Sequence, residues 1–309
     1  MLFAKSATCA ETTTDSDYTS PNISILKYVP AGTFQLDDDT ANTSTVSAFR
    51  MSQHEITRTQ FKAIMGADPS DTERSSSLGD PVQNVNWYHA IAFCNKLSLA
   101  EGLKPAYTVS GVDFSALSFS DIPTSSANLS WDATTCDWSA NSYRLPTEME
   151  WMWAAMGAQD DYNKSYAGTS LGSSVFDYAW YRDNSGEKTH PVGEKGANEL
   201  GLYDMSGNVI ELCWDWYTAY PANALTEFRG SGTCRILRGG CWNDVAGYLT
   251  VANRSDTYPY IQNYSFGFRV VRPWVLNITK SSVIQLFVVN LNQEEGIRLS
   301  ISIAPENLP

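Results

Sequence analysis

The 309-residue chain lacks two features that would each point to a class of protein. Lys and Arg number 21 against 34 Asp and Glu, and the formal net charge is −13. A general attraction for nucleic-acid phosphates or anionic membranes is therefore not expected. The sequence also has no run of about 18 apolar residues, which a membrane-spanning helix needs. We therefore predict no nucleic-acid partner and no membrane-spanning segment.

Cysteine and histidine are scarce, and their spacing does not favour metal or redox chemistry. The six cysteines include no CxxC pair of the kind that zinc and thiol–disulfide sites use, so buried free thiols are expected. A disulfide from Cys136 to a distant cysteine stays open. The only histidines are His54, His89 and His190, and they show neither HxxxH nor HxH spacing. The sequence therefore predicts no redox cofactor, and the three histidines are expected to play ordinary structural roles.

What the chain does contain is typical of a globular domain with many short elements. Hydrophobic residues make up 43% of it and charged residues 18%, with ten Trp and 16 Tyr. Large rings fill the space between short elements. Capping boxes and closing glycines predict helices over residues 57–66, 86–102 and 147–157. The long Ser- and Thr-rich stretch between the second and third helices is expected to be an irregular insertion with short strands.

Alternating apolar and polar residues predict strands in four other places. The segment 23–36 has a Pro-Ala-Gly turn at its centre, and we expect it to form a hairpin. Another strand is expected within 46–57, and "NVIELCWDWY" over 208–217 is predicted to be a strand buried on both faces. Near the end of the chain, 283–291 and 297–303 are typical of two strands joined across a polar turn.

Seven segments resemble a known family in both sequence and order. They are "YVPAGTFQL", "HEITRTQF", "PVQNVNWYHAIAFCNKLS", "YRLPTEMEWMWAA", "HPVGEKGANELGLYDMSGNVIELCWDWY", "RILRGGCWND" and "GFRVVR". This set is similar to that of formylglycine-generating-enzyme-like domains, also called sulfatase-modifying-factor domains, which are a branch of the C-type lectin fold. The resemblance implies an α+β fold over residues 25–272, with much irregular structure and few short helices and strands.

The enzymes of this family oxidise a substrate cysteine with two thiols of their own and copper. Asp244 stands where the resemblance would place the first thiol, and no cysteine follows Cys241. A lone thiolate cannot hold Cu(I) between two sulfurs or pass its oxidation to a partner. We therefore predict no catalytic residues, with Cys241 as a small buried side chain. The alternative is a formylglycine-generating or sulfoxide-synthase-type metal-dependent oxidase that has an unusual active site.

The segment 235–272 resembles the variable region of proteins diversified by retroelements that mutate adenines, the variable proteins of Treponema among them. From Asn243 to Phe268 it contains no Lys, Glu, Met or Trp and one Gln. Mutation of the adenines in an Asn codon of the form AAY cannot produce any of those five residues. The composition is therefore what such a process would leave.

Side chains of this variable region divide into a packed set and a displayed set. We expect Leu249, Val251, Ala252 and Phe268 to pack inward, with Trp242 and Arg254 as framework residues. Tyrosines among small polar residues are typical of binding surfaces, because rigid rings supply contact area at low entropic cost. The residues predicted to face solvent and bind a ligand are Asn243, Asp244, Ala246, Tyr248, Asn253, Ser255, Asp256, Thr257, Tyr258, Tyr260, Asn263 and Tyr264.

The stretch "YDMSGNVIEL" corresponds to a calcium-binding stretch in the family's enzymes. The resemblance implies carboxylate ligands from Asp204 and Glu211 and backbone carbonyl ligands from Gly207 and Val209. All four are hard oxygen donors of the kind that Ca²⁺ requires. We expect a structural Ca²⁺ here, which would hold a long loop together.

These observations predict a non-catalytic ligand-binding protein at the cell surface. Residues 1–24 are expected to be a disordered leader, which is attached to a membrane only if Cys9 carries a lipid. Residues 25–272 form the domain, and 273–309 form a tail with a predicted β-hairpin of unassigned role. The partner is an unknown protein or glycan, and a monomer is expected. A structural surface protein with no specific ligand is a third alternative.

Overall fold

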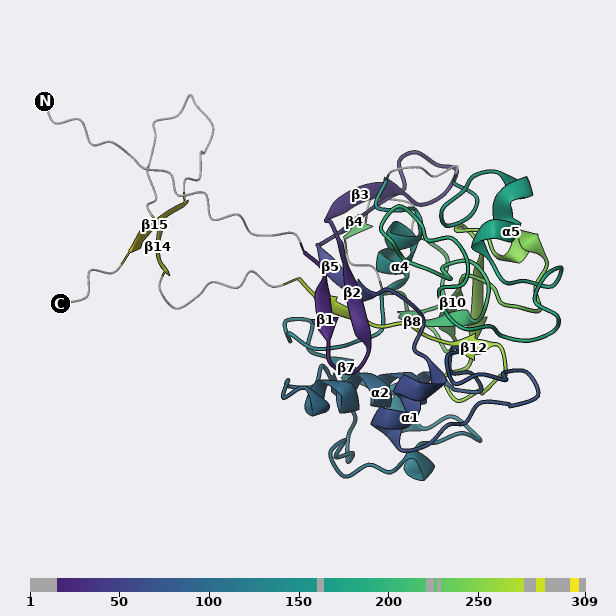
Figure 1. The fold of residues 1–309 in the computed structure, drawn as a ribbon. Coiled ribbons are helices and arrows are strands. Elements are labelled where there is room, and N and C mark those ends of the chain that lie inside the picture. Colours follow the sequence, from purple (N-terminus) through teal and green to yellow (C-terminus); the bar gives the residue numbers. More distant parts are fainter. Residues whose placement is uncertain are drawn as a thin grey trace, which may run out of the picture. The chain divides into compact units, whose positions relative to one another are not determined.

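A computed structural model describes residues 16–159, 164–220, 225–226, 229–274, 282–286 and 301–305 of the protein. One compact unit spans Thr14–Trp274 and carries every candidate site residue (Figure 1). The tail belongs to a second unit, in which β14 (Ser282–Leu286) and β15 (Ile301–Pro305) pair antiparallel. Cys9 lies outside the described residues.

The first four-stranded sheet joins the two ends of the main unit. Its order is β1-β2-β5-β13, and every neighbouring pair is antiparallel. The last strand therefore closes the domain against strands from its beginning. The strands are β1 (Tyr18–Ser20), β2 (Ser24–Val29), β5 (Phe49–Ser52) and β13 (Val271–Pro273).

The second four-stranded sheet, β11-β10-β8-β12, contains three strands of the segment 235–272, which is predicted to be variable. Its centre is β8 (Ile210–Trp216), whose first six residues are buried, so the predicted fully buried strand is confirmed. β10 runs antiparallel to β8 and to β11, whereas the short β12 is parallel to β8. The other strands are β10 (Arg235–Arg238), β11 (Arg254–Thr257) and β12 (Phe266–Gly267).

Short strands and single helical turns complete the main unit, as the aromatic-rich composition predicts. Three strands form the sheet β3-β4-β9, and the predicted insertion contributes the pair β6-β7. The strands are β3 (Gly32–Gln35), β4 (Thr43–Val46), β9 (Leu225–Thr226), β6 (Tyr107–Thr108) and β7 (Thr135–Cys136). The single turns are η1 (Phe119–Asp121), α3 (Leu129–Asp132), η2 (Gly172–Ser174), α5 (Val175–Tyr178) and η3 (Ala246–Tyr248).

The three longer helices begin where the sequence predicts. They are α1 (Arg58–Met65), α2 (Trp87–Ala100) and α4 (Glu148–Ala155), and each has a complete capping box. In each box the side chain of the residue before the helix accepts a backbone N–H, while the side chain of the third residue accepts in return. No helix among the described residues is both long enough and apolar enough to span a bilayer.

Two aromatic-rich clusters form the core of the main unit. In one, α1 and α2 lie side by side, and Phe61 of α1 stacks on Phe93 of α2 with centroids 5.6 Å apart (Figure 1). Phe268 meets both rings edge to face, so the end of the variable region packs on this pair. In the other cluster α4 is buried, and Trp153 stacks on Phe34. The end of the segment 235–272 therefore packs on a close-packed aromatic cluster.

Two of the strand-level predictions are wrong. The proposed leader extends too far, because residues 18–20 form β1 and pair with β2. The segment 23–36 contains two strands but is not a hairpin, since β2 pairs with β1 and β5 while β3 pairs with β4. The turn residues predict a reversal of the chain, but the choice of partner strand depends on contacts far along the sequence.

Candidate functional site

We call residues 243–264 the display segment. Hydrogen bonds of its main chain hold its first half in place. The backbone N–H of Asp244 donates to the carbonyl of Cys241, and the carbonyl of Asp244 accepts from the N–H of Arg182 at 3.0 Å. The N–H of Val251 donates to the carbonyl of Ser165 at 2.9 Å. None of these bonds uses a side chain of the display segment.

The second half is bound to the framework in the same way. β11 pairs with β10 in register, and the carbonyl of Pro259 accepts from the N–H of Trp87 at 3.0 Å. The carbonyl of Asn263 accepts from the N–H of Asn84 at 2.9 Å. Main-chain bonds of this kind persist when side chains change. The side chains of Asp244, Asn253 and Gln262 also bond main-chain groups, so changes at these three positions would affect the backbone more.

Most of the predicted ligand-binding side chains reach the surface. Tyr248 is 57% exposed, Tyr258 50% and Tyr264 42%, and these values are high for large aromatic residues. Asn243 and Asp256 are also exposed. Six other members of the predicted set are half-buried: Asp244, Ala246, Asn253, Ser255, Tyr260 and Asn263.

Two assignments within the display segment are wrong. Thr257 is buried at 8% exposure, because its place at the end of β11, opposite Arg235, turns it toward the interior. Ala252, predicted to pack inward, is exposed. Leu249, Val251 and Phe268 are buried, as predicted. Alternation along a strand decides which residues are displayed, and the bounds of β11 are not visible in the sequence.

A partly buried ion pair fixes β11 to α4. Arg254 donates from Nε and Nη2 to the two carboxylate oxygens of Glu148, at 2.6 and 2.8 Å. Glu148, at the start of α4, also accepts a longer contact from Arg238 at 3.4 Å. The prediction that Arg254 is a framework residue is confirmed by this bidentate geometry.

Cys241 lies in a tight turn that Asp244 closes. The backbone N–H of Cys241 donates to Oδ2 of Asp244 at 2.9 Å. The thiol is buried, and this burial raises the pKa of Cys241 to about 12, with a smaller contribution from Asp244. A thiol in this state is a poor nucleophile at neutral pH.

Each of the three histidines has a different structural role. His89 accepts in the capping box of α2 and stacks on Phe119. His190 stacks on Trp180, and His54 stacks on Tyr203. Within the described part of the chain, no three His, Cys, Asp or Glu side chains form a group that could hold a metal ion.

The predicted calcium turn lies in a buried acidic region. Asp204 and Asn208 both have positive φ, near 57°, and Gly207 has φ of 89°. Oδ2 of Asp204 accepts from the N–H of Gly193, whereas its buried Oδ1 has no hydrogen-bond partner among the described residues. Burial raises the pKa of Asp204 to about 6. An unpartnered buried carboxylate oxygen fits a cation ligand.

The other carboxyl groups of this region differ in how well they fit calcium. Both oxygens of Glu211 are bound by Arg269, at 2.7–2.9 Å, and Oε2 also accepts from Trp151 Nε1. Glu55 is buried, and burial together with Asp204 and Glu211 raises its pKa well above the usual range. Glu55, Asp204 and Glu211 all act on the buried guanidinium of Arg269, and Glu211 is already paired with it, so Oδ1 of Asp204 is the carboxylate oxygen that could bind a cation.

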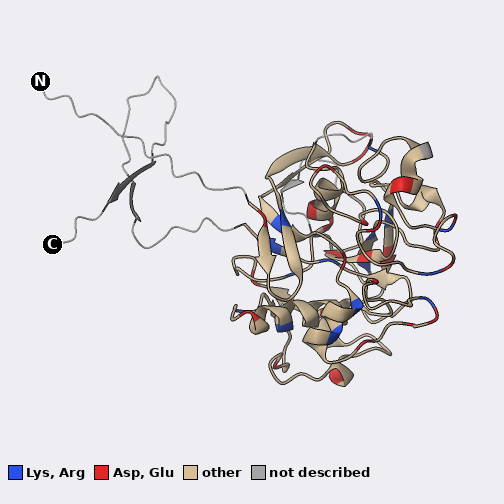
Figure 2. Ribbon diagram, in the orientation of Figure 1, with Lys and Arg blue, Asp and Glu red and all other residues tan. Residues whose placement is uncertain are grey.

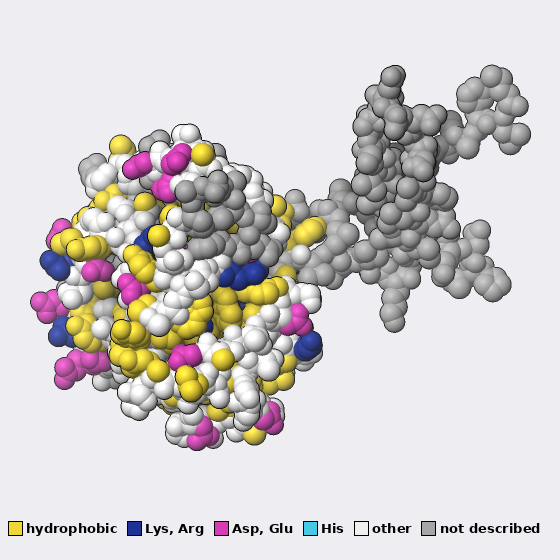
Figure 3. All heavy atoms as spheres, turned by 180° about the vertical axis from the view of Figure 1, so that it is seen from behind, with side chains coloured by type: hydrophobic (Ala, Val, Ile, Leu, Met, Phe, Trp, Pro, Cys, Tyr) yellow, Lys and Arg dark blue, Asp and Glu magenta, His cyan; other side chains and the backbone are white. Residues whose placement is uncertain are grey.

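A groove lies beside the display segment. It has a volume of about 340 Å³ and is lined in part by Tyr258 and Tyr260, whose rings stack with centroids 5.7 Å apart. We call it the aromatic groove. Its other lining residues are Ala127, Asp132, Trp216, Gly232, Thr233 and Pro259. Figure 3 shows one face of the main unit, where hydrophobic side chains gather in a broad band with few charged groups within it.

Charged residues of both signs are spread along the fold of the main unit. Figure 2 shows acidic and basic residues scattered over its strands, helices and loops, with no stretch of one sign running across it.

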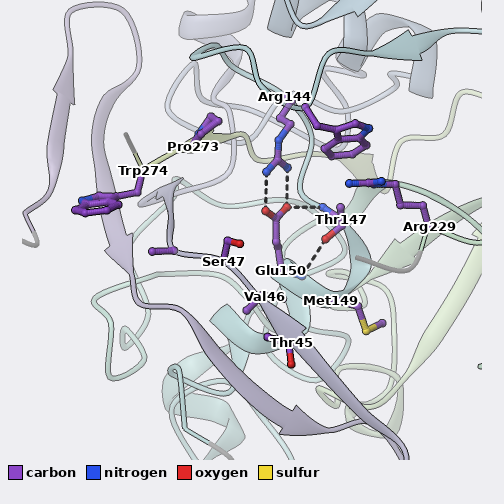
Figure 4. A pocket seen from close by; sticks show the side chains of 12 residues that line it. Thr45, Val46, Ser47, Arg144, Thr147, Met149, Glu150, Arg229, Pro273 and Trp274 are labelled. Atoms are coloured by element: carbon purple, nitrogen blue, oxygen red, sulfur yellow. Dashed lines mark hydrogen bonds and ion pairs between the residues drawn. The ribbon is translucent and has the colours of Figure 1, made fainter. Parts of the chain in front are cut away.

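A second, smaller hollow of about 200 Å³ lies between β4 and the start of α4. Figure 4 shows the guanidinium of Arg144 facing the carboxylate of Glu150, with both Nη atoms donating at 2.6 Å. Glu150 also accepts from the N–H of Thr147 in the capping box. Arg229 lies over the ring of Trp138. The acid and base of this hollow bind each other, so they form part of the framework.

The sequence model of the sulfatase-modifying factor enzyme 1-like domain matches residues 14–274. The chain belongs to this family. A curated relative, "Chaperone protein LppX" of Paenibacillus barcinonensis, is 38% identical over 215 residues, or 64% of this chain and 70% of that protein. The formylglycine-generating enzyme of Streptomyces coelicolor is 30% identical over 158 residues, or 46% of this chain and 50% of that enzyme.

A solved member of the same fold is similar over nearly its whole length. "Treponema denticola variable protein 1" superposes with a TM-score of 0.77 at 40% identity, covering 83% of this chain and 99% of that one. CarF follows with a TM-score of 0.60 at 26% identity, covering 81% and 98%. The predicted resemblance to Treponema variable proteins on a formylglycine-generating-enzyme-like α+β fold is therefore confirmed.

Two features near the site are not visible in the sequence. Glu148 is recognisable there only as part of a helix start, yet it is the residue that Arg254 binds. Asp132 and Trp216 come from the insertion and from the end of β8, and the fold brings both to the groove beside Tyr258. Neither has a local motif, so only the tertiary structure could find them.

Proposed function

We propose that the protein is a non-catalytic ligand-binding protein of the cell surface. Its display segment presents diversified side chains to a protein or glycan target. The observation that supports this function best is the separation of roles within residues 243–264. Their main chain binds the framework, while Tyr248, Tyr258 and Tyr264 are exposed to solvent. Such a surface can change its exposed rings without refolding, because main-chain bonds to Ser165, Arg182, Asn84 and Trp87 hold its backbone.

This function predicts that the displayed tyrosines are free to vary. Changing Tyr248, Tyr258 or Tyr264 to serine should each lower the free energy of unfolding by no more than about 1 kcal/mol, since 42–57% of each residue is exposed. Urea unfolding of the single variants measures this. Tyr107→Ser is the control, because that ring is buried against Trp214 and its loss should cost about 3–5 kcal/mol. A loss as large at the displayed positions would contradict the proposal.

Binding is tested directly by screening the protein against extracellular proteins and glycans, with Tyr258→Ser as the matched variant. We expect a target whose affinity falls in the variant while the unfolding free energy stays the same. For the rival oxidase, copper content and activity of Cys241→Ala are decisive. Stoichiometric Cu(I) that is lost in this variant together with an oxidase activity would overturn the proposal.

The genetic origin of the display segment has its own test. We propose that the codons for residues 238–269 have a near-copy elsewhere in the genome that differs only at adenines and lies beside a reverse transcriptase. Attachment through a lipid at Cys9 and a monomeric state belong to the same proposal. Mass spectrometry of the native protein tests the first, and light scattering of the purified protein tests the second.

We further propose that Ca²⁺ binds at the acidic turn, held by Asp204, Glu211 and the carbonyls of Gly207 and Val209. Addition of Ca²⁺ at about 1 mM, roughly 100 times a Kd of order 10⁻⁵ M, should stabilise the protein by about 2.7 kcal/mol. Thermal unfolding with Ca²⁺ and with a chelator measures this. Asp204→Asn should abolish the difference, whereas Asp183→Asn at an exposed position should keep it. An equal midpoint with Ca²⁺ and with chelator would overturn the calcium proposal.

A further inference from the structure

The aromatic groove has one wall inside the display segment and one outside it. Tyr258 and Tyr260 form the inner wall, and both belong to the set predicted to vary. Trp216 and Asp132 form the outer wall, and neither lies within residues 235–272. A ligand that enters this groove therefore meets a pair of residues that remains the same whatever the display segment carries.

The carboxylate of Asp132 is held in a fixed orientation. Oδ1 accepts from the hydroxyl of Tyr88 at 2.5 Å, and that hydroxyl accepts in turn from the backbone N–H of Asn128 at 3.2 Å. Tyr88 is fully buried, so its ring cannot swing away. Among the described residues Oδ2 of Asp132 has no hydrogen-bond partner, and the side chain is half-buried at the groove. One oxygen of an ionised carboxylate is thus available to a ligand.

The charge and the walls of the groove favour a cation. Asp132 is the one carboxylic acid among its lining residues, and none of them is Lys or Arg. Arg235 lies 3.3 Å from the ring centroid of Trp216, but it is 1% exposed and does not line the groove. Arg235 and Asp132 attract each other, but Asp132 is the charged group that a ligand in the groove can contact. Aromatic rings around a carboxylate attract organic cations through both the ring quadrupole and the charge.

We propose that the aromatic groove takes a cationic side chain, lysine or arginine, of a protein partner. The inference rests on the proposed function and narrows it from any ligand to a protein with an exposed basic side chain. Asp132 and Trp216 set the chemical class of the group that is bound. The variable residues Tyr258 and Tyr260 shape the remainder of the groove and select among partners. A buried aromatic–cation contact of this kind is where binding energy concentrates in protein interfaces.

The test compares two small probes that differ mainly in charge. N-acetyl-arginine amide and N-acetyl-citrulline amide have nearly the same shape, and only the first is a cation. Their binding to the full chain is measured by ligand-observed NMR at roughly physiological ionic strength, where unspecific attraction to a chain of net charge −13 is screened. We expect the arginine probe to bind at least about tenfold more tightly, a difference of about 1.4 kcal/mol.

Two isosteric variants test whether the preference for the arginine probe depends on Asp132. Asp132→Asn keeps the oxygen that Tyr88 binds but removes the charge, and it should abolish the tenfold preference. Asp183→Asn removes the same charge from an exposed position and should leave the preference intact. Equal binding of the two probes, no binding of either, or an equal loss in both variants would each overturn the inference. Thermal midpoints of both variants confirm that they are folded.

Failure here can be told apart from failure of the proposed function. One outcome is that a target captured in the screen loses its binding in Tyr258→Ser and keeps it in Asp132→Asn. In that case the display function stands and the cation inference is wrong. Capture of neutral glycans alone leads to the same conclusion. If no target depends on the display segment, the proposed function itself fails.

Discussion

Replacing Arg269 with methionine should lower the free energy of unfolding by about 3–5 kcal/mol, because it leaves a buried charge without its partner. Arg269 is fully buried and donates to both oxygens of Glu211 and to the carbonyls of Ser52 and Tyr203. Its removal leaves Glu211 unpaired beside two other buried carboxyl groups. Since a domain is stable by only about 5–15 kcal/mol, this is a large share.

Urea unfolding of Arg269→Met measures the loss, and Lys104→Met is the matched control. Lys104 pairs with Asp137 at 2.9 Å, but its side chain is 80% exposed, so its removal should cost less than about 1 kcal/mol. The double variant Arg269→Met, Glu211→Gln should recover part of the loss, because it also removes the unpaired charge. Similar small losses in Arg269→Met and Lys104→Met would show that the buried pair is not structurally important.

Replacing Gly207 with alanine should cost about 2–5 kcal/mol, from backbone strain and steric overlap together. Its φ of +89° disfavours a residue with a side chain, and an added Cβ would lie 2.3 Å from the carbonyl oxygen of Trp180. That oxygen also accepts from the N–H of Asn208, so it cannot move away freely. The added atom would also press on Leu249, on which the display segment rests.

Substitutions at two other glycines separate the cost of backbone strain from the cost of steric overlap. Gly111 has φ of +78° with nothing near an added Cβ, so Gly111→Ala should cost only about 1 kcal/mol. Gly247 has neither constraint, and Gly247→Ala should be neutral within about 0.5 kcal/mol. Chemical unfolding of the three variants gives the order Gly207, Gly111, Gly247. A Gly207→Ala loss no larger than that of Gly111→Ala would mean that the loop of Trp180 moves aside.

The fold could be predicted from the sequence where its signals are local. Capping residues and closing glycines identify the three long helices, because a helix end satisfies its own backbone groups within four residues. The apolar run of β8 predicts a strand buried on both faces for a similar reason. Strand pairing is different, because residues 23–36 contain two strands that pair with different partners. No residue near them in the chain predicts this choice.

The candidate site also has features that local sequence predicts and one that it does not. Exposure of Tyr248, Tyr258 and Tyr264 follows from their setting among small polar residues, and the inward packing of Leu249 and Val251 follows from their hydrophobicity. The burial of Thr257 does not, because a polar β-branched residue fits either face and the register of β11 against β10 decides between them.

By itself, the sequence determined the family, the places of the helices and which segment carries the exposed tyrosines, since each depends on residues close together in the chain. Only the tertiary structure decided that Glu148 holds Arg254, that Arg269 neutralises Glu211, and that Asp132 and Trp216 meet the display segment at a groove. Those contacts join residues that lie far apart in the chain. Their energies arise from burial and charge, which exist only once the chain has folded.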